Sequence, residues 1–178
     1  MRKILLIALF SLFSNSFCQV QKFDFENILN IDKKEFKGLR LENDNFKDVK
    51  FITPKGFMSE SYKIEPYLSY ENEQTEFRIK FKYYASSWLF HNKIIMKVGD
   101  ETMDFPVNPI EKVIKGGISE ISDISLNESE IDFLRKVSSS PKDVIIRFEG
   151  EEYADQKLYS QERNYLRKLI DFFDKFKK

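Results

Sequence analysis

A run of alternating side chains over residues 75–84 is the feature that most constrains the fold of this chain. Its two parities hold an apolar set and a basic set: Phe77, Ile79, Phe81 and Tyr83 against Arg78, Lys80 and Lys82. Successive side chains of a strand point to opposite faces of a sheet, so this run predicts a strand with one buried and one solvated face. The segment 63–70 and the polar turn at 71–74 complete a predicted β-hairpin.

The same signal predicts further strands, and helical spacing predicts three helices. The expected strands are 39–41, 49–51, 88–98, 102–106, the two halves of 111–126 on either side of Gly116 and Gly117, 143–150 and 152–159. Helices are expected over 24–30, from Asn127 to before Pro141, and from Ser160 to the C-terminus. We therefore predict a mostly β (α+β) fold, an antiparallel sandwich or bent sheet with one mid-chain helix and a C-terminal helix packed on it. The C-terminal helix, lysine-rich on one side and phenylalanine-rich on the other, could alternatively lie on a membrane surface.

The N-terminal residues have the pattern of a secretory signal peptide. Two basic residues, Arg2 and Lys3, precede an apolar run over 4–13 that is too short to span a membrane. Cleavage is expected between Cys18 and Gln19, which divides the chain into a signal peptide, 1–18, and a single β-rich domain, 19–178. Within that domain, 19–60 would form an N-terminal arm and 61–178 the main sheet and helices. Lipidation of Cys18 is the alternative, but the bulky Phe17 does not fit the small residue that a lipidation motif requires.

Composition excludes several classes of function for the mature chain. Removal of Arg2 and Lys3 from the 29 basic residues leaves 27 against 29 acidic residues, which is not the basic footprint of a nucleic-acid-binding protein. Loss of the single cysteine with the signal peptide leaves no disulfide and no thiolate, and one histidine remains. We therefore expect no metal site, no cofactor and no integral membrane span. Aromatic residues make up 15% of the chain and indicate a packed interior.

Trp88 and His91, the only tryptophan and the only histidine, lie three residues apart. If 88–98 is one continuous strand, Trp88 shares the buried face with Phe90, Ile94 and Met96, and His91 shares the opposite face with lysines. This assignment predicts that Trp88→Ala destabilises the fold far more than His91→Ala. It also predicts that the two side chains cannot form a common site.

Other residues offer weaker candidates for chemistry. Glu120, Glu151, Glu152 and Asp155 could supply the two carboxyl groups of a glycosidase, but acids are frequent enough to pair by chance. Arg147 could form a cross-strand ion pair or bind an anionic ligand, and the ion pair is favoured. The acidic turn at 42–45 lacks the ligand spacing of a calcium loop and is interpreted as a solvated turn. With His91 as the sole candidate base and no nucleophile elbow, we expect no catalytic residues.

Several short motifs follow one another along the chain from about Lys63 onward. They are Trp88-Leu89-Phe90, the turn Gly99-Asp100, Glu120 after a glycine bend, and Arg147-Phe148-x-Gly150 followed by Tyr153. In their order they resemble an uncharacterised kind of exported bacterial β-rich module, over roughly two-thirds of the chain. The resemblance implies a fold and no activity.

Three functional hypotheses follow from the sequence. The first is a non-enzymatic exported binding or accessory module of the bacterial cell envelope, periplasmic or extracellular, with an unknown protein or envelope partner. The second is a carboxylate-dependent hydrolase acting on envelope or extracellular glycans. The third is a carrier that holds a small apolar ligand in its aromatic interior.

Overall fold

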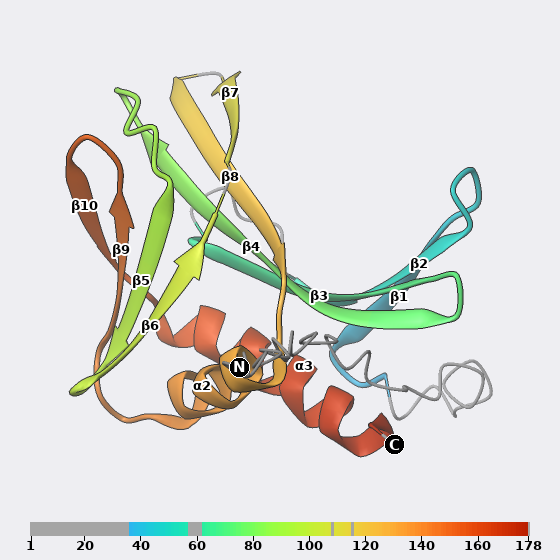
Figure 1. Cartoon of the computed structure of the whole chain (residues 1–178). Helices are drawn as coiled ribbons and strands as arrows, with labels where there is room; N and C mark the ends of the chain where they lie inside the picture. The colour runs from blue at the N-terminus through green and yellow to red at the C-terminus, as the bar shows by residue number, and fades with distance from the viewer. Residues whose placement is uncertain (1–35, 57–61, 108, 115, 178) are drawn as a thin grey trace, which may run out of the picture.

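The computed structural model describes residues 36–56, 62–107, 109–114 and 116–177 (Figure 1). The expected signal peptide, its cleavage site between Cys18 and Gln19, and the expected helix over 24–30 lie outside these residues. The described residues form ten strands and two helices, in this order: β1 (Leu39–Asp44), β2 (Val49–Pro54), β3 (Ile64–Glu71), β4 (Gln74–Ala85), β5 (Lys93–Val98), β6 (Glu101–Pro106), β7 (Ile110–Ile114), β8 (Gly117–Ser125), α2 (Glu128–Ser139), β9 (Val144–Glu149), β10 (Tyr153–Lys157) and α3 (Ser160–Phe176).

The strands form two antiparallel sheets, so the predicted fold class is confirmed. The larger sheet has the order β1-β2-β3-β4-β8-β7, and the smaller has the order β10-β9-β5-β6. In the larger sheet, the predicted hairpin is formed by β3 and β4, which pair from Ile64 opposite Phe81 to Glu71 opposite Gln74. The apolar parity of β4 is buried as predicted, since Phe77, Ile79, Phe81 and Tyr83 are all at most 8% exposed.

Helices α2 and α3 lie together beneath the sheets (Figure 1). Helix α2 begins where predicted, because the side chain of Asn127 accepts from Glu130 N while the Glu130 carboxylate accepts from Asn127 N. Helix α3 contacts β2 and β3 and also α2, which confirms the prediction that it packs on the sheet. Among the residues that the structure describes, no helix is both long enough and apolar enough to cross a membrane.

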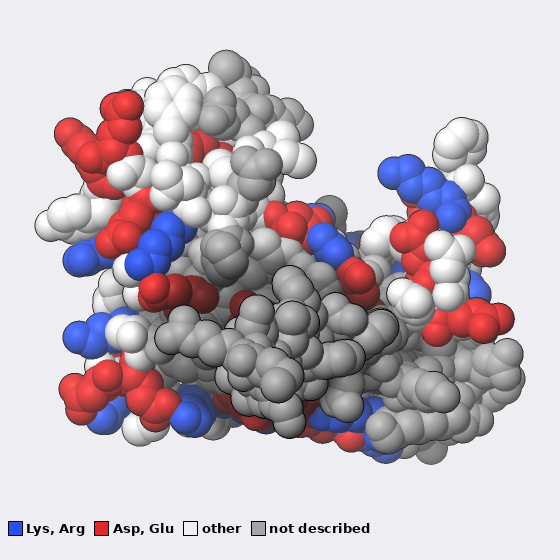
Figure 2. Space-filling model, viewed as in Figure 1, with Lys and Arg blue, Asp and Glu red and all other residues white. Residues whose placement is uncertain are grey.

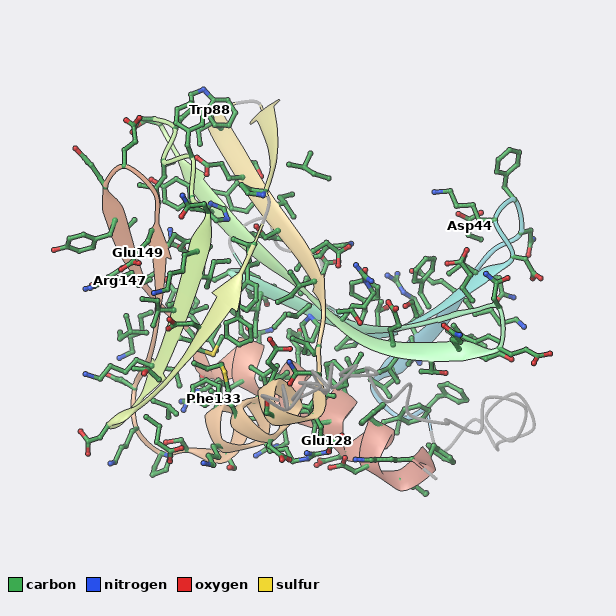
Figure 3. The ribbon with its side chains drawn as sticks, in the orientation of Figure 1. Asp44, Trp88, Glu128, Phe133, Arg147 and Glu149 are labelled. Carbon is green, nitrogen blue, oxygen red and sulfur yellow. The ribbon has the colours of Figure 1, made fainter. Side chains whose placement is uncertain are left out.

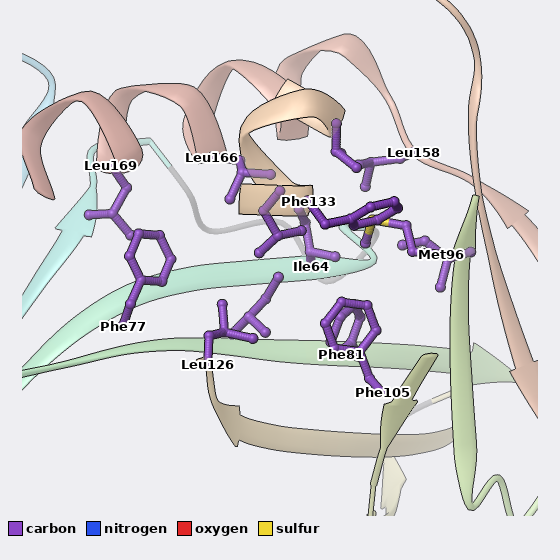
Figure 4. Packing of buried hydrophobic residues seen from close by; sticks show 14 of the residues in the cluster. Ile64, Phe77, Phe81, Met96, Phe105, Leu126, Phe133, Leu158, Leu166 and Leu169 are labelled. Atoms are coloured by element: carbon purple, nitrogen blue, oxygen red, sulfur yellow. The ribbon is translucent and has the colours of Figure 1, made fainter. Parts of the chain in front are cut away.

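The core lies between the sheets and the helices, and its aromatic side chains contact one another (Figure 4). The ring centroids of Phe81 and Phe105 are 5.1 Å apart, and those of Phe77 and Phe173 are 5.4 Å apart. These pairs join strands of both sheets and helix α3 into one apolar cluster. Ring contacts at this distance add to the stabilisation from burial of the rings.

The segment 88–92 departs from the prediction, since β5 begins only at Lys93. Leu89 and His91 are buried, whereas Phe90 is exposed, so the predicted faces are reversed at this end. The buried parity changes at Asn92 and Lys93, after which Ile94, Met96 and Val98 are buried as predicted. The physical reason is the backbone of Phe90, which has a φ of 52° in the left-handed region and cannot continue a strand.

Candidate functional site

A buried carboxylate holds the segment 89–91 at one end of the molecule. The Glu120 side chain projects from β8 toward the core and accepts from three successive backbone N–H groups. The donor–acceptor distances are 2.6 Å from Leu89 N, 3.0 Å from Phe90 N and 2.9 Å from His91 N. Successive N–H groups around a left-handed residue form a concave anion-binding surface, and here the anion is supplied by the chain itself.

The His91 ring extends this hydrogen-bond network. Its Nδ1 lies 2.8 Å from Glu120 Oε2, and its Nε2 lies 3.0 Å from Ser122 Oγ, two residues along β8. Phe148 and Tyr83 pack edge-on against the imidazole, with ring centroids 5.1 Å and 6.5 Å away. His91, Glu120 and Ser122 are all 0% exposed. His91 is therefore a core residue, and its predicted place on a solvated face is wrong.

The pKa shifts of Glu120 and His91 indicate which atoms of this network carry protons. Burial alone would raise the pKa of Glu120, but the N–H groups of His91, Leu89 and Phe90 and the His91 ring together bring it below its ordinary value. Burial lowers the pKa of His91, against the opposing hydrogen bond and charge of Glu120. The pair is therefore an ionised carboxylate and a neutral imidazole at neutral pH. Nδ1–H then donates to Glu120, and Nε2 accepts from the Ser122 hydroxyl.

Two glycines lie against the backbone between the end of β4 and Phe90. A side chain at Gly150 would place its Cβ 2.0 Å from the carbonyl oxygen of Leu89 and 2.9 Å from that of Phe90. A Cβ at Gly117 would lie 2.5 Å from the carbonyl oxygen of Ala85. Both approaches are closer than any side chain allows, so these positions require glycine. The backbone that leads into β5 is thus confined by β8 and by the turn between β9 and β10.

The confined segment presents two aromatic rings on the outside of the molecule. Trp88 and Phe90 stack with centroids 5.8 Å apart and an interplanar angle of 22°. Phe90 is 49% exposed, while Trp88 is half-buried and partly packed against the core. Figure 3 places Trp88 at the upper end of the molecule. We call Trp88 and Phe90 the aromatic platform.

The order of groups in the buried network is that of a nucleophile, a base and an orienting acid: Ser122, His91 and Glu120. A nucleophile must nevertheless meet its substrate, and the Ser122 side chain has no exposed surface. In this structure the network therefore fixes the backbone of 89–91. It does not present a reactive hydroxyl to solvent.

The remaining predicted candidates lie elsewhere. Arg147 forms the predicted cross-strand ion pair, with Nε and Nη2 each 2.7 Å from a carboxylate oxygen of Asp155. That hydrogen bond from Arg147 lowers the pKa of Asp155, the opposite of what a general acid needs. Glu151 and Glu152 are exposed in the turn between β9 and β10.

The acidic turn after β1 is closed by its own backbone. Asp44 Oδ1 accepts from Phe46 N at 3.0 Å and from Lys47 N at 3.3 Å. These are the contacts of a polar turn, as predicted. In the part of the chain that the structure describes, no group of three or more His, Cys, Asp or Glu side chains is placed to hold a metal ion.

Sequence reasoning missed the partnership of Glu120 and Ser122 with His91, although a signal was present. On a strand over 117–125, Glu120 and Ser122 share one parity with Ile118 and Ile124. Two polar residues between apolar ones on a core-facing parity indicate buried polar groups that need partners. The sequence could not identify His91 as the partner, because its inward position depends on the non-strand backbone of residues 88–92.

Comparison of the chain with protein-family models found no matching family, and no curated protein and no solved structure gave a significant match.

Proposed function

We propose that this chain is a non-enzymatic exported binding or accessory module of the bacterial cell envelope, and that it holds its partner through the aromatic platform. The observation that supports this proposal is the combination of exposed aromatic rings with a rigid, buried support. Phe90 is about half exposed and yet lies within the segment 89–91, which is fixed by the fully buried Glu120 and His91.

Two features of this support, the left-handed backbone of Phe90 and the buried carboxylate of Glu120, are energetically unfavourable by themselves. A bulky residue in the left-handed region is strained by roughly 1–3 kcal/mol, and such strain concentrates at functional sites. Burial of the Glu120 carboxylate also requires several donors to offset its desolvation. Together these features hold two rings in one orientation, and preorganised aromatic side chains are the usual anchors of protein interfaces.

The hydrolase and carrier hypotheses have less support. Glu120 has a lowered pKa and is sealed from solvent, and Asp155 is held by Arg147. The core rings that a carrier would use to line a pocket contact one another instead, as Phe81 and Phe105 do (Figure 4).

Site-specific photocrosslinking in exporting cells tests the binding proposal. A benzophenone side chain at position 90 should give a discrete adduct of higher mass, and Trp88→Ala should abolish that adduct. The matched control is position 46, a phenylalanine that is 97% exposed at the tip of the hairpin of β1 and β2. An adduct from position 46 alone, or from neither position, would contradict the proposal.

Export is tested separately. The intact mass of the exported protein should correspond to a chain that begins at Gln19. A mass that corresponds to a chain beginning at an acylated Cys18 would instead identify a lipoprotein.

A further inference from the structure

Acidic side chains stand beside the aromatic platform. The turn between β9 and β10 carries the exposed Glu151 and Glu152, and it begins at Gly150, which touches the carbonyls of Leu89 and Phe90. The turn is also tied to the base of the platform, because Asn92 N donates to Glu149 O at 2.9 Å. Figure 2 shows acidic side chains gathered at this upper end of the molecule, next to an uncharged surface.

The geometry of the platform suits a flat cation. Trp88 and Phe90 are within 22° of parallel, so a planar group on the exposed Phe90 ring would continue the stack. Aromatic faces attract cations, and the nearby carboxylates of Glu151 and Glu152 would add charge attraction. An ammonium group would gain from the charge, but it has no planar face with which to stack.

A guanidinium held by an aromatic ring and a carboxylate already occurs within the chain, on β9 and β10 beside β5. The Arg147 guanidinium lies 4.3 Å from the centroid of the Tyr153 ring and forms two 2.7 Å hydrogen bonds with Asp155. Arg147 thus occupies a site made of one aromatic face and one carboxylate. Trp88, Phe90, Glu151 and Glu152 combine the same two kinds of group, aromatic faces and carboxylates, on the outside of the molecule, where a partner could supply the arginine.

We infer that the platform binds a guanidinium group, carried by an arginine-containing segment of a partner protein. This inference rests on the proposed function, and it names the chemical class of the partner. The guanidinium stacks on the aromatic pair, and its N–H groups reach the carboxylates of the turn.

Fluorescence of the intact protein measures this directly, because Trp88 is the only tryptophan of the chain. Titration with tri-arginine should change the Trp88 emission, and tri-arginine should bind about five- to tenfold more tightly than tri-lysine. About 0.5 M salt should weaken binding, since it shortens the screening length to a few ångströms. Equal affinities for the two peptides would overturn the guanidinium inference, as would the absence of any change with tri-arginine.

Variants locate the charge requirement. The double substitution Glu151→Gln, Glu152→Gln should weaken tri-arginine binding about tenfold. The matched control Asp100→Asn, Glu101→Gln removes the same charge from the turn between β5 and β6, at the opposite end of that sheet (Figure 1). Equal loss in both variants would mean that only net charge matters and would overturn the inference. If the Glu151, Glu152 variant retains the position 90 crosslink and loses no affinity for tri-arginine, the inference fails while the proposed function stands.

Discussion

Two fully buried glutamates serve as anchors in this molecule, and their environments differ in an instructive way. Glu120 on β8 accepts from the N–H groups of Leu89, Phe90 and His91. Glu162 in α3 accepts from three N–H groups as well, those of Lys63, Ile64 and Tyr159. The same number of donors nevertheless leaves the two carboxyl groups with opposite pKa shifts.

The difference lies in what surrounds each carboxylate. Burial raises the pKa of Glu162, and its three N–H donors only partly offset this. At Glu120 the donors are consecutive and the His91 ring adds a further hydrogen bond, so the pKa falls below its ordinary value. Glu162 caps its own helix and joins α3 to β3, whereas Glu120 supports a strained segment that carries exposed rings. The carboxylate that supports the platform, Glu120, is therefore the one with more hydrogen-bond donors around it.

The largest expected effect is the loss of the Glu120 carboxylate. Glu120→Ala leaves the N–H groups of Leu89, Phe90 and His91 and the His91 ring without their acceptor, and each buried group of this kind costs about 1–3 kcal/mol. We expect the free energy of unfolding to fall by about 4 kcal/mol in urea titrations. Ser122→Ala, which removes only the outermost hydroxyl of the network, should cost about 1 kcal/mol. A loss below that of Ser122→Ala would show that Glu120 is not the anchor.

The next largest effect concerns His91. His91→Ala removes a fully buried ring and leaves a cavity beside Tyr83 and Phe148, so we expect a loss of about 3 kcal/mol. Trp88→Ala should cost only about 1 kcal/mol, because the indole is half-buried. This order reverses the one that strand parity predicts. Thermal or urea unfolding of both variants decides it, and a costlier Trp88→Ala would restore the parity assignment.

The smallest effects are the responses of the two anchors to pH. His91 has a lowered pKa in the fold, so below about pH 6.5 the unfolded chain binds a proton that the folded chain does not, and stability falls on acidification. The lowered pKa of Glu120 extends this loss to lower pH. The raised pKa of Glu162 acts oppositely, since it contributes stability at low pH that is lost as pH rises through the folded pKa.

Glu162→Gln should therefore cost about 1 kcal/mol at neutral pH, and more in acid, where it removes a group that is favourably protonated. Urea unfolding of Glu162→Gln and wild type at pH 4.5 and 7 measures the difference. A cost that is larger at pH 7 than at pH 4.5 would mean that the fold lowers the pKa of Glu162, as it lowers that of Glu120.

Local sequence determined most of the secondary structure of the described residues. Alternation over 77–83 sets the buried face of β4, and the Asn127 cap sets the start of α2. Gly99 and Asp100 set the turn between β5 and β6. These features depend on the residue types within one segment, because side-chain parity and capping act over a few residues. Even the Arg147–Asp155 pair could be predicted, since neighbouring strands bring opposite charges together.

The tertiary structure alone decided where residues 88–92 point. By sequence they continue a strand, but the N–H groups of Leu89, Phe90 and His91 find a carboxylate on β8, some 30 residues away along the chain. That contact stabilises a left-handed Phe90, reverses the buried parity, and turns His91 inward and Phe90 outward. A strand's alternation holds only while its backbone makes ladder hydrogen bonds. Where a buried side chain accepts those N–H groups instead, the faces are set by the partner and not by the parity.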